Sequence, residues 1–380
     1  MIYPGHITTV TKLYQQFDGK SAASLFLKNY FRQHRSHGSR DRRIITEGFF
    51  SLLRIGNAFA KRDFLFRHMA ASALTVNEQW QTYWKQHHHE AFAAVESELV
   101  YFDAERIFPC AEHISSTVDK VAFIKSHLHE NDIFLRVNNS YQKKVQQYLT
   151  QQQIPYEVIP KSNSIRIQRH ADLMSSRCYQ AGAFEVQDLM SQACMEQIEV
   201  LDNETWLDAC AGSGGKTLAL MDRVVHLGLK NVTITVNDVR PAIIKSAQSR
   251  LAKYNFTNIH FSVADACLKM NDKMYDKIII DAPCSGSGTW ARSPEALSIF
   301  SHAQLEEFVV LQKLILANVL QVLRKGGYAY YITCSVYQNE NEDVLAILPT
   351  DEYTILSSEY YKGYDTRADT MFMATIYKHK

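Results

Sequence analysis

Residues 207–217 read LDACAGSGGKT, which places a glycine-rich turn between an apolar strand and the start of a helix. Glycines in such a turn let a ligand approach backbone N–H groups beyond the carboxyl end of the strand, although a tight turn without a ligand would look the same. A phosphate-binding P-loop would need Gly at 210, where Cys210 stands, and a dinucleotide-binding turn counted from Gly212 would need Gly at 217, where Thr217 stands. The turn therefore predicts a ligand crevice without the spacing of these two phosphate-binding loops.

Strands and helices alternate in the chain around and after this turn. Apolar stretches predict strands at 205–210, 232–238, 259–265, 276–283, 328–335 and 371–377. Helical segments begin near Gly215, Pro241 and Ala303. This alternation is typical of a parallel, doubly wound sheet, so we predict an α/β fold with a Rossmann-like domain over residues 179–380.

Aspartates stand at the ends of four predicted strands, at positions 208, 238, 265 and 281. A single aspartate at such a point most often has a capping role. Four of them beside a glycine turn favour a nucleoside cofactor, because one carboxylate can accept hydrogen bonds from both ribose hydroxyls and the next from an adenine amino group. Without phosphate-binding spacing, S-adenosylmethionine fits this crevice better than NAD or ATP. The predicted cofactor-binding residues are Cys210, Ala211, Gly212, Ser213, Gly214, Gly215, Lys216, Asp238 and Asp265.

Two of the seven cysteines stand at strand ends in unusual surroundings. Cys284 lies in DAPCSGSG (281–288), where Pro283 and the glycines break the strand and place the thiol in a turn at the crevice. Cys334 follows the predicted strand YAYYITCS in a similar position. Because the cysteines are scattered and form no CxxC pair, we predict neither a disulfide framework nor a metal site. Small buried apolar residues are expected at Cys110, Cys178, Cys194 and Cys267.

Composition limits the class of protein. The chain has 380 residues, of which 46% are apolar and 21% charged, and this excludes a disordered or collagenous chain and predicts more than one domain. No apolar run reaches the roughly 18 residues of a membrane span, and residues 1–20 lack the pattern of a signal peptide. We therefore expect a cytoplasmic protein with no membrane segment, and we expect a monomer.

The residues before the Rossmann-like domain predict two further domains. Residues 1–100 show helical periodicity, and the segment from Lys28 to Arg67 carries ten Lys or Arg against three acidic residues. That surplus makes 1–100 a candidate RNA-binding domain, with a solvated helix face as an equal alternative. Residues 101–178 predict a small α/β module of ferredoxin or RNA-recognition-motif shape, from strands at 133–139, 154–159 and 164–168 around one helix. Because this module lacks aromatic-rich strands, a spacer role is expected for it.

In this order, LDACAGSGGKT, DAPCSGSG and YITCS resemble the signature of the Sun-type RNA cytosine-C5 methyltransferases, whose best-known bacterial members modify small-subunit ribosomal RNA. Further matches are Val186-Gln187-Asp188, Glu340-Asn-Glu342 and Asp369-Thr-Met-Phe-Met-Ala374. The resemblance covers most of residues 180–380, and it implies a Rossmann-like class I S-adenosylmethionine-dependent methyltransferase domain after a helical domain and a small α/β linker. One departure is Gly212-Ser213, where the family often has Ala-Pro.

The resemblance also implies a reaction. The enzyme would transfer a methyl group from S-adenosylmethionine to C5 of a cytosine in RNA, with Cys334 as the thiolate that adds to C6. Cys284 would assist the later proton removal and product release. Asp281 is implied both as a catalytic residue that holds the cytosine edge and as a residue that reaches the cofactor. Lys216 is the candidate cation that would keep the attacking thiol ionised.

Three alternatives to a ribosomal RNA methyltransferase stay open. A transfer RNA could be the substrate of the same chemistry. A DNA cytosine-C5 methyltransferase would use Cys284 as the nucleophile and would leave Cys334 dispensable. A non-catalytic ribosome-assembly factor would bind RNA without turnover, but the intact cysteines and strand-end acids argue against it. We therefore expect RNA as the partner, and small-subunit ribosomal RNA before other RNAs.

Overall fold

The computed structural model describes every residue of the chain except 161, 168–171, 255, 271–272 and 380. The chain forms two compact units, the first made of Met1–Glu130 and Thr289–Gln304 and the second of Asn131–Gly288 and Leu305–Lys380. The domain boundaries at residues 100 and 178 stay predictions. Of the helices that the structure describes, none is both long enough and apolar enough to cross a membrane.

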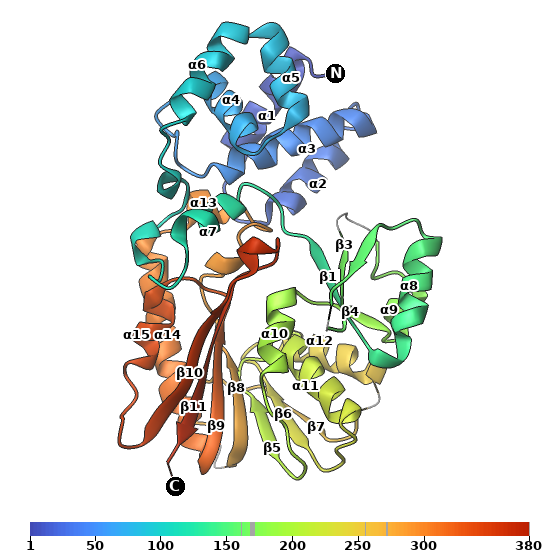
Figure 1. Cartoon of the computed structure of the whole chain (residues 1–380), viewed down its shortest axis with the longest axis vertical. Helices are drawn as coiled ribbons and strands as arrows, with labels where there is room; N and C mark the ends of the chain where they lie inside the picture. Colours follow the sequence, from blue (N-terminus) through green and yellow to red (C-terminus); the bar gives the residue numbers. More distant parts are fainter. Residues whose placement is uncertain (161, 168–171, 255, 271–272, 380) are drawn as a thin grey trace. The chain divides into compact units, whose positions relative to one another are not determined.

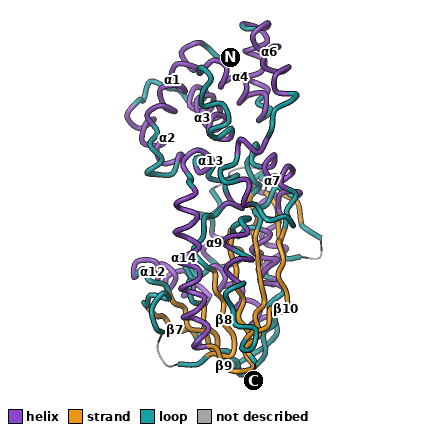
Figure 2. The backbone as a smooth tube through the Cα atoms, turned by 90° about the vertical axis from the view of Figure 1, so that its left-hand side faces the viewer, coloured by secondary structure: helices purple, strands orange, loops and turns teal. Residues whose placement is uncertain are grey.

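The second unit contains a seven-stranded sheet with the order β10-β11-β9-β8-β5-β6-β7 (Figures 1 and 2). Its strands are β5 (Thr205–Asp208), β6 (Thr233–Asn237), β7 (Ile259–Ser262), β8 (Tyr275–Asp281), β9 (Leu323–Thr333), β10 (Tyr353–Tyr361) and β11 (Met371–Lys378). Strands β5 to β9 pair in parallel, and β11 pairs antiparallel with β9 and β10. The predicted α/β fold with a Rossmann-like sheet is therefore confirmed.

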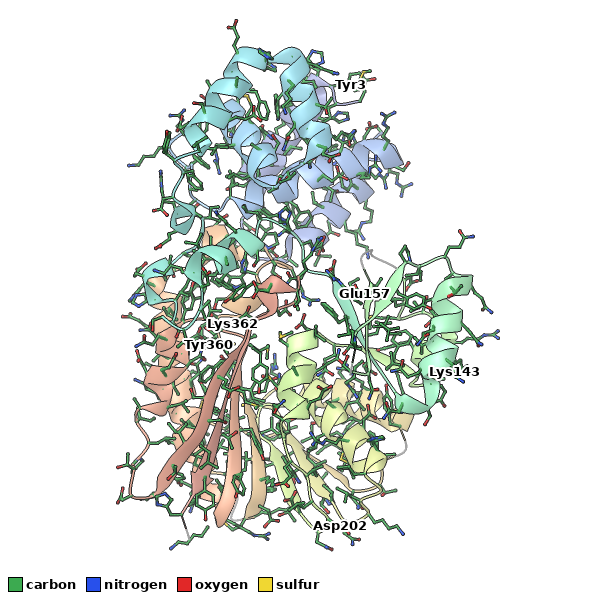
Figure 3. All side chains as sticks on the ribbon, viewed as in Figure 1. Tyr3, Lys143, Glu157, Asp202, Tyr360 and Lys362 are labelled. Atoms are coloured by element: carbon green, nitrogen blue, oxygen red, sulfur yellow. The ribbon has the colours of Figure 1, made fainter. Side chains whose placement is uncertain are left out.

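The central strands are buried on both faces, because side chains alternate along a strand and helices cover each side. Trp206 and Ile279 belong to the core beneath α10, α11 and α12, whereas Leu207 and Ile278 belong to the core beneath α14 and α15 (Figures 1 and 3). These helices are α10 (Leu189–Glu196), α11 (Gly215–His226), α12 (Pro241–Leu251), α14 (His302–Val319) and α15 (Glu342–Leu345). Burial on both faces explains the nearly continuous apolar runs in the sequence.

Strand β10 is absent from the predictions made from the sequence. It lies at the edge of the sheet, pairs only with β11 among the described strands, and has mostly exposed side chains. An edge strand of this kind does not need an apolar face, so its residues YTILSSEYY show no clear alternation. Its pairing with β11 is what identifies it.

A smaller, four-stranded antiparallel sheet with the order β2-β3-β1-β4 precedes the large one in the chain. Its elements are β1 (Ile133–Val137), α8 (Gln142–Gln151), β2 (Tyr156–Val158), β3 (Ser164–Ile167), α9 (Arg177–Gln180) and β4 (Phe184–Val186). Leu135, Val145 and Phe184 lie in its core, whereas Lys143 of α8 points away from the sheet (Figure 3). The three predicted strands correspond to β1, β2 and β3, although residue 168 lies outside the described residues. Strand β4 follows residue 178.

The first unit is helical, as predicted for residues 1–100. Its first helices are α1 (Pro4–Gln16), α2 (Ala23–Gln33), α3 (Ser39–Arg54), α4 (Phe64–Leu74), α5 (Glu78–His87) and α6 (His89–Leu99). The predicted core residues Leu27, Phe31 and Phe49 are buried, whereas Arg40 and Arg43 are exposed. A contact of RNA with these arginines stays a prediction.

Gly288 lies where three backbone segments of the second unit meet at the carboxyl end of the large sheet. Its N–H donates to the carbonyl oxygen of Cys334 at 2.9 Å, and its own carbonyl oxygen accepts from the N–H of Thr370 at 3.0 Å. A Cβ atom at this position would lie 2.0 Å from the carbonyl oxygen of Thr370. Glycine therefore allows the turn after β8 to pack against the end of β9 and the start of β11.

We expect Gly288→Ala to destabilise the second unit by about 1–3 kcal/mol, because the Thr370 carbonyl group must move to make room. Gly5→Ala in α1 is the control, since a Cβ there meets nothing within 4 Å, and it should be neutral or stabilising by up to about 1 kcal/mol. Denaturant unfolding followed by circular dichroism measures both variants. An unchanged unfolding midpoint for Gly288→Ala would contradict the packing argument.

Candidate active site

The two cysteines singled out in the sequence lie next to each other at the carboxyl end of the large sheet. Cys284 comes three residues after β8 and Cys334 one residue after β9, and these strands are parallel neighbours. Their Sγ atoms are 3.4 Å apart, which is a hydrogen-bond contact between two free, half-buried thiols. The hydrogen bond with Cys334, then burial, the charge of Cys334 and the charge of Glu340, raise the pKa of Cys284 well above its ordinary value. Cys284 therefore keeps its proton at neutral pH.

A buried ion pair lies beside the cysteines. Lys216 is the second residue of α11, and its Nζ is 2.6 Å from Oδ2 of Asp281, the last residue of β8. Burial by itself lowers the pKa of Lys216, but the charge and hydrogen bond of Asp281, together with the charge of Cys334, more than reverse this effect. The pKa of Lys216 is raised, so the site contains a permanent cation.

A cavity of about 320 Å³ opens beyond the carboxyl ends of β5, β6 and β8. Three carboxylates line it, those of Asp238, Asp265 and Asp281. The other lining residues are largely apolar, namely Ala209, Cys210, Val239, Arg240, Ala264, Ala266, Cys267, Pro283, Leu311 and Ile315. Hydrogen-bond acceptors at the rim of an apolar slot suit a nucleoside with a ribose diol and an amino group. The residues present therefore fit S-adenosylmethionine.

Asp238 is buried, and four hydrogen bonds occupy its carboxylate. Oδ2 accepts from the N–H of Gly212 at 3.0 Å and from Nη2 of Arg240 at 3.0 Å, and Oδ1 accepts from the N–H and the Nε of Arg240. Burial raises the pKa of Asp238, but the hydrogen bonds and charge of Arg240 outweigh it, so the pKa is lowered. Because the Arg240 side chain is 62% exposed, its two side-chain hydrogen bonds are the ones that a diol can replace.

The glycine turn has a backbone that explains its departure from the expected Ala-Pro. Gly212 and Gly214 have positive φ angles of 53° and 80°, which glycine adopts without strain. A Cβ at Gly212 would meet nothing within 4 Å, so the turn is open at this point. Ser213 is held by Nη1 of Arg250, which donates to its hydroxyl at 3.1 Å. The turn is thus fixed by a side chain of α12 and not by a proline ring.

Asp208 and Asn237 lie beneath the turn and connect the strand ends. Oδ2 of Asp208 accepts from the Thr217 hydroxyl at 2.6 Å, and complete burial raises the pKa of Asp208 to about 7. Asn237 Nδ2 donates to the carbonyl oxygens of Ala209 and Ala264, each at 3.0 Å. These two polar residues tie α11 and the ends of β5, β6 and β7 into one rigid frame.

The structure brings most of the residues predicted from the sequence to one edge of the sheet. Cys210, Asp238, Asp265 and Asp281 line the cavity, and Lys216 pairs with Asp281. Ala211, Gly212, Ser213, Gly214 and Gly215 form the neighbouring turn without lining the cavity. Among the described residues, no group of three or more His, Cys, Asp or Glu is arranged to hold a metal ion.

Sequence reasoning gives no functional role to three residues at this edge. Arg240 covers the carboxylate of Asp238, and Glu340 and Gln312 are fully buried beside the cysteine turns. Glu340 enters the sequence analysis only as part of a family match. The other buried residues of α14 are apolar, so a glutamine on that face of the helix is the one signal that could have pointed to Gln312.

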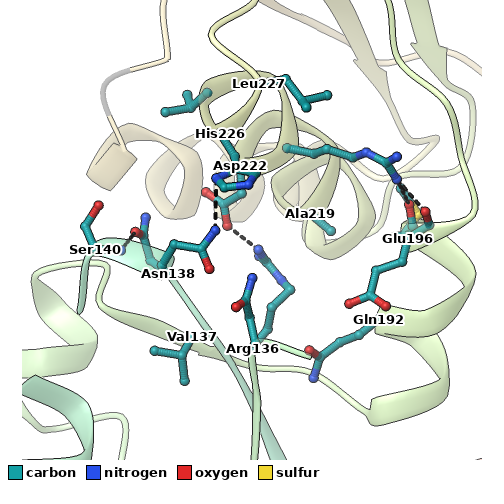
Figure 4. A pocket seen from close by; sticks show the side chains of 15 residues that line it. Arg136, Val137, Asn138, Ser140, Gln192, Glu196, Ala219, Asp222, His226 and Leu227 are labelled. Atoms are coloured by element: carbon teal, nitrogen blue, oxygen red, sulfur yellow. Dashed lines mark hydrogen bonds and ion pairs between the residues drawn. The ribbon is translucent and has the colours of Figure 1, made fainter. Parts of the chain in front are cut away.

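A second cavity, of about 630 Å³, lies in the same unit among β1, α10 and α11 (Figure 4). Arg136 forms an ion pair with Asp222 across it, and Nδ2 of Asn139 contacts Nδ1 of His226 at 2.9 Å. Arg223 Nη1 donates to the carbonyl oxygen of Glu196 at 2.5 Å. None of the site residues predicted from the sequence lines this cavity.

Residues 195–377 match the family model described as 16S rRNA methyltransferase RsmB/F. The chain is similar to the ribosomal RNA small subunit methyltransferase B of Photorhabdus laumondii, with 30% identity over 218 residues, which is 55% of this chain and 49% of that protein. Its counterpart in Yersinia enterocolitica is 26% identical over 221 residues, covering 56% of this chain and 50% of that protein. The chain thus spans about half the length of the curated relatives it matches.

Two solved structures have a similar fold. The crystal structure of PH0851 matches with a TM-score of 0.73 and 18% identity, covering 100% of this chain and 99% of that one. NSun6 from Pyrococcus horikoshii with SFG matches with a TM-score of 0.63 and 14% identity, covering 72% of this chain and 99% of that one. With the family match, they lead to one conclusion: residues 195–377 are similar to the Sun-type (RsmB/F) methyltransferase family, and the chain has the fold of S-adenosylmethionine-dependent methyltransferases.

Proposed function

We propose that this chain transfers a methyl group to C5 of a cytosine in small-subunit ribosomal RNA through a covalent bond between a cysteine and C6. The observation that carries the proposal is the pair of thiols 3.4 Å apart, beside the Lys216–Asp281 ion pair, whose Asp281 also lines the cofactor cavity. The names of the curated relatives and of the family model support ribosomal RNA as the substrate.

Cytosine C5 is a poor nucleophile, because the ring is aromatic and electron-poor. A thiolate that adds to C6 forms an S–C6 bond and makes C5 enamine-like, so that C5 can take a methyl group. S-adenosylmethionine supplies that methyl group from its sulfonium centre. A base then removes the C5 proton, and the S–C6 bond breaks with its electron pair returning to sulfur. The ring regains its aromatic character and the thiolate is regenerated.

The surroundings of the two cysteines favour different roles for them. Cys334 is the attacking thiolate, because Lys216 places a positive charge within its electrostatic reach. Cys284 keeps its proton, so it can donate that proton to the Cys334 sulfur as the S–C6 bond breaks and thereby assist release. The Asp281 carboxylate, held by Lys216, can accept a hydrogen bond from the cytosine edge.

The target base must leave its stack to reach two half-buried thiols at the carboxyl end of the sheet. A cytosine in a loop or a single strand is therefore the natural substrate, since little pairing energy opposes its exit. Ribosomal and transfer RNA both offer such positions, and the relatives' names favour the ribosomal small subunit.

Bisulfite sequencing tests the substrate directly. In a strain that lacks the gene, one cytosine of small-subunit ribosomal RNA should lose its methylation signal relative to the parent strain, while transfer RNA signals stay constant. A plasmid copy of the gene should restore the signal, whereas a Cys334→Ala copy should not. Loss of a transfer RNA signal alone would contradict the ribosomal substrate.

Cysteine variants test the order of events. We expect Cys334→Ala to abolish methyl transfer without weakening cofactor binding, because this thiol is needed only when the base is in place. Cys284→Ala should accumulate a protein–RNA adduct that survives denaturing gel electrophoresis, and the double variant should form none. Cys110→Ser, which changes a cysteine outside the site, is the control and should behave like the parent. An adduct that needs Cys284 and forms without Cys334 would support the DNA-type order.

Calorimetry with S-adenosylmethionine tests the cavity. We expect Asp238→Ala to weaken binding by about 1.5–3 kcal/mol, the range for hydrogen bonds to a charged group. Arg240→Ala is the matched variant, and it should bind the cofactor at least as tightly as the parent because it removes the group that occupies Asp238. Equal losses of cofactor affinity in both variants would show that the Asp238–Arg240 pair acts as one structural unit. They would contradict the claim that Asp238 binds the diol in place of Arg240.

A further inference from the structure

Glu340 connects the two turns that carry the cysteines. It is the last residue of the short helix η7 (Gln338–Glu340) and is fully buried. Its Oε1 accepts from the N–H of Ser285 at 2.7 Å, and its Oε2 accepts from the hydroxyl of Ser285 at 2.5 Å and from that of Ser335. Ser285 follows Cys284 and Ser335 follows Cys334, so one carboxylate determines the spacing of the two thiols.

All hydrogen-bond donors to the Glu340 side chain are neutral groups. Besides the two serines, Nε2 of Gln312 donates to Oε1 at 2.9 Å and also to the carbonyl oxygen of Pro283 at 3.0 Å. No Lys or Arg among the described residues pairs with this carboxylate. A negative charge without an ion-pair partner is therefore held in the interior, next to the Cys284 turn.

A carboxylate and a cation both lie near the cysteine pair. The charge of Glu340 acts with the hydrogen bond and with burial to raise the pKa of Cys284. Lys216 lies within electrostatic reach of Cys334, whose charge contributes to raising the pKa of Lys216. Two thiols in contact share at most one negative charge at moderate pH, and the raised pKa of Cys284 disfavours its location on Cys284.

Other titratable groups also face the pair or its neighbours. They are Asp188, Cys194, Lys216, Asp281, Tyr331 and Tyr360. Asp281 forms an ion pair with Lys216, so these two opposite charges act together near Cys334. Glu340 has no such counter-charge among the described residues, and two of its three hydrogen bonds from serines come from Ser285, next to Cys284.

We propose that Glu340 is a positioning residue that assigns the two cysteines their different roles, by tying their turns together and by keeping Cys284 in the thiol form. This inference rests on the proposed function, and it explains why Cys334 is the cysteine that attacks C6. Glu340 touches no reacting atom and acts through Ser285, Ser335 and its charge.

Alkylation of the two thiols at a series of pH values tests the inference without any RNA. Iodoacetamide reacts with the thiolate, and peptide mass spectrometry reports Cys284 and Cys334 separately. Glu340→Gln keeps the shape of the side chain and removes its charge. We therefore expect it to shift the pH midpoint of Cys284 alkylation, called the Cys284 midpoint below, to lower pH by about one unit. Cys334 in the same molecules is the internal reference and should shift less. The rate of methyl transfer should fall about tenfold, because part of the thiolate is then at Cys284, which does not attack C6.

Two further variants separate charge from structure. Glu340→Asp keeps the charge, and Ser335→Ala removes one hydrogen bond while leaving the charge in place, so both should retain the Cys284 midpoint of the parent. Glu359→Gln makes the same change at an exposed carboxylate on β10 and is the matched control. These variants test the inference even if Glu340→Gln does not fold.

The inference is overturned if the Cys284 midpoint of folded Glu340→Gln equals that of the parent, or if Ser335→Ala shifts it as far. Equal shifts of both cysteines would also overturn it, since a general loosening of the site would then be the cause. Absence of methyl transfer by the unaltered protein would contradict the proposed function, but it would leave the alkylation result intact, so the two failures are distinguishable.

Discussion

The parallel pairing of β8 with β9 is the constraint on which the rest of the site depends. Asp281 at the end of β8 lies opposite Ile332 of β9, so both strands end at the same edge of the sheet. Cys284 and Cys334, which are 50 positions apart in the chain, thereby come into contact. Gly288 reinforces this arrangement, because its backbone bonds to the segments that follow β9 and precede β11.

The charged residues of the site are brought together at this edge of the sheet by the segments around β8 and β9. The amino-terminal turn of α11 brings Lys216 to Asp281, and the helix after β9 brings Glu340 to Ser285. A cation and a carboxylate are therefore buried near two otherwise similar thiols. Burying each charge is costly in free energy, and it is tolerated because Lys216 has an ion-pair partner and Glu340 has several hydrogen-bond donors. A covalent mechanism with two cysteines needs this inequality, since one must attack while the other keeps a proton.

The cofactor cavity shows how a protein can prepare a binding group before the ligand arrives. Asp238 is ionised and satisfied by Arg240, so a buried carboxylate does not lack hydrogen-bond partners when no nucleoside is present. Because Arg240 is largely exposed, water can take over the solvation of its guanidinium group when it leaves. When hydrogen bonds from a ribose diol replace those from Arg240, the desolvation free energy that opposes binding stays low. The site also keeps its selectivity for a diol.

Local sequence patterns were enough to predict much of the fold and of the candidate site of this protein. The glycine turn, the apolar strands β5 to β9, the strand-end acids and the two cysteine motifs are readable because each depends on residues close together in the chain, and the family resemblance rests on those same motifs. The tertiary structure alone decided that β10 is a strand, that Arg240 covers Asp238, and that Glu340 and Gln312 hold the cysteine turns. The contacts of Glu340 with Ser285 and of Gln312 with Pro283 join segments far apart in the chain, whereas Arg240 reaches Asp238 from two residues away through the turn after β6. Which polar side chain meets which partner is set by strand order and packing, and neither hydrophobic periodicity nor turn propensity encodes it.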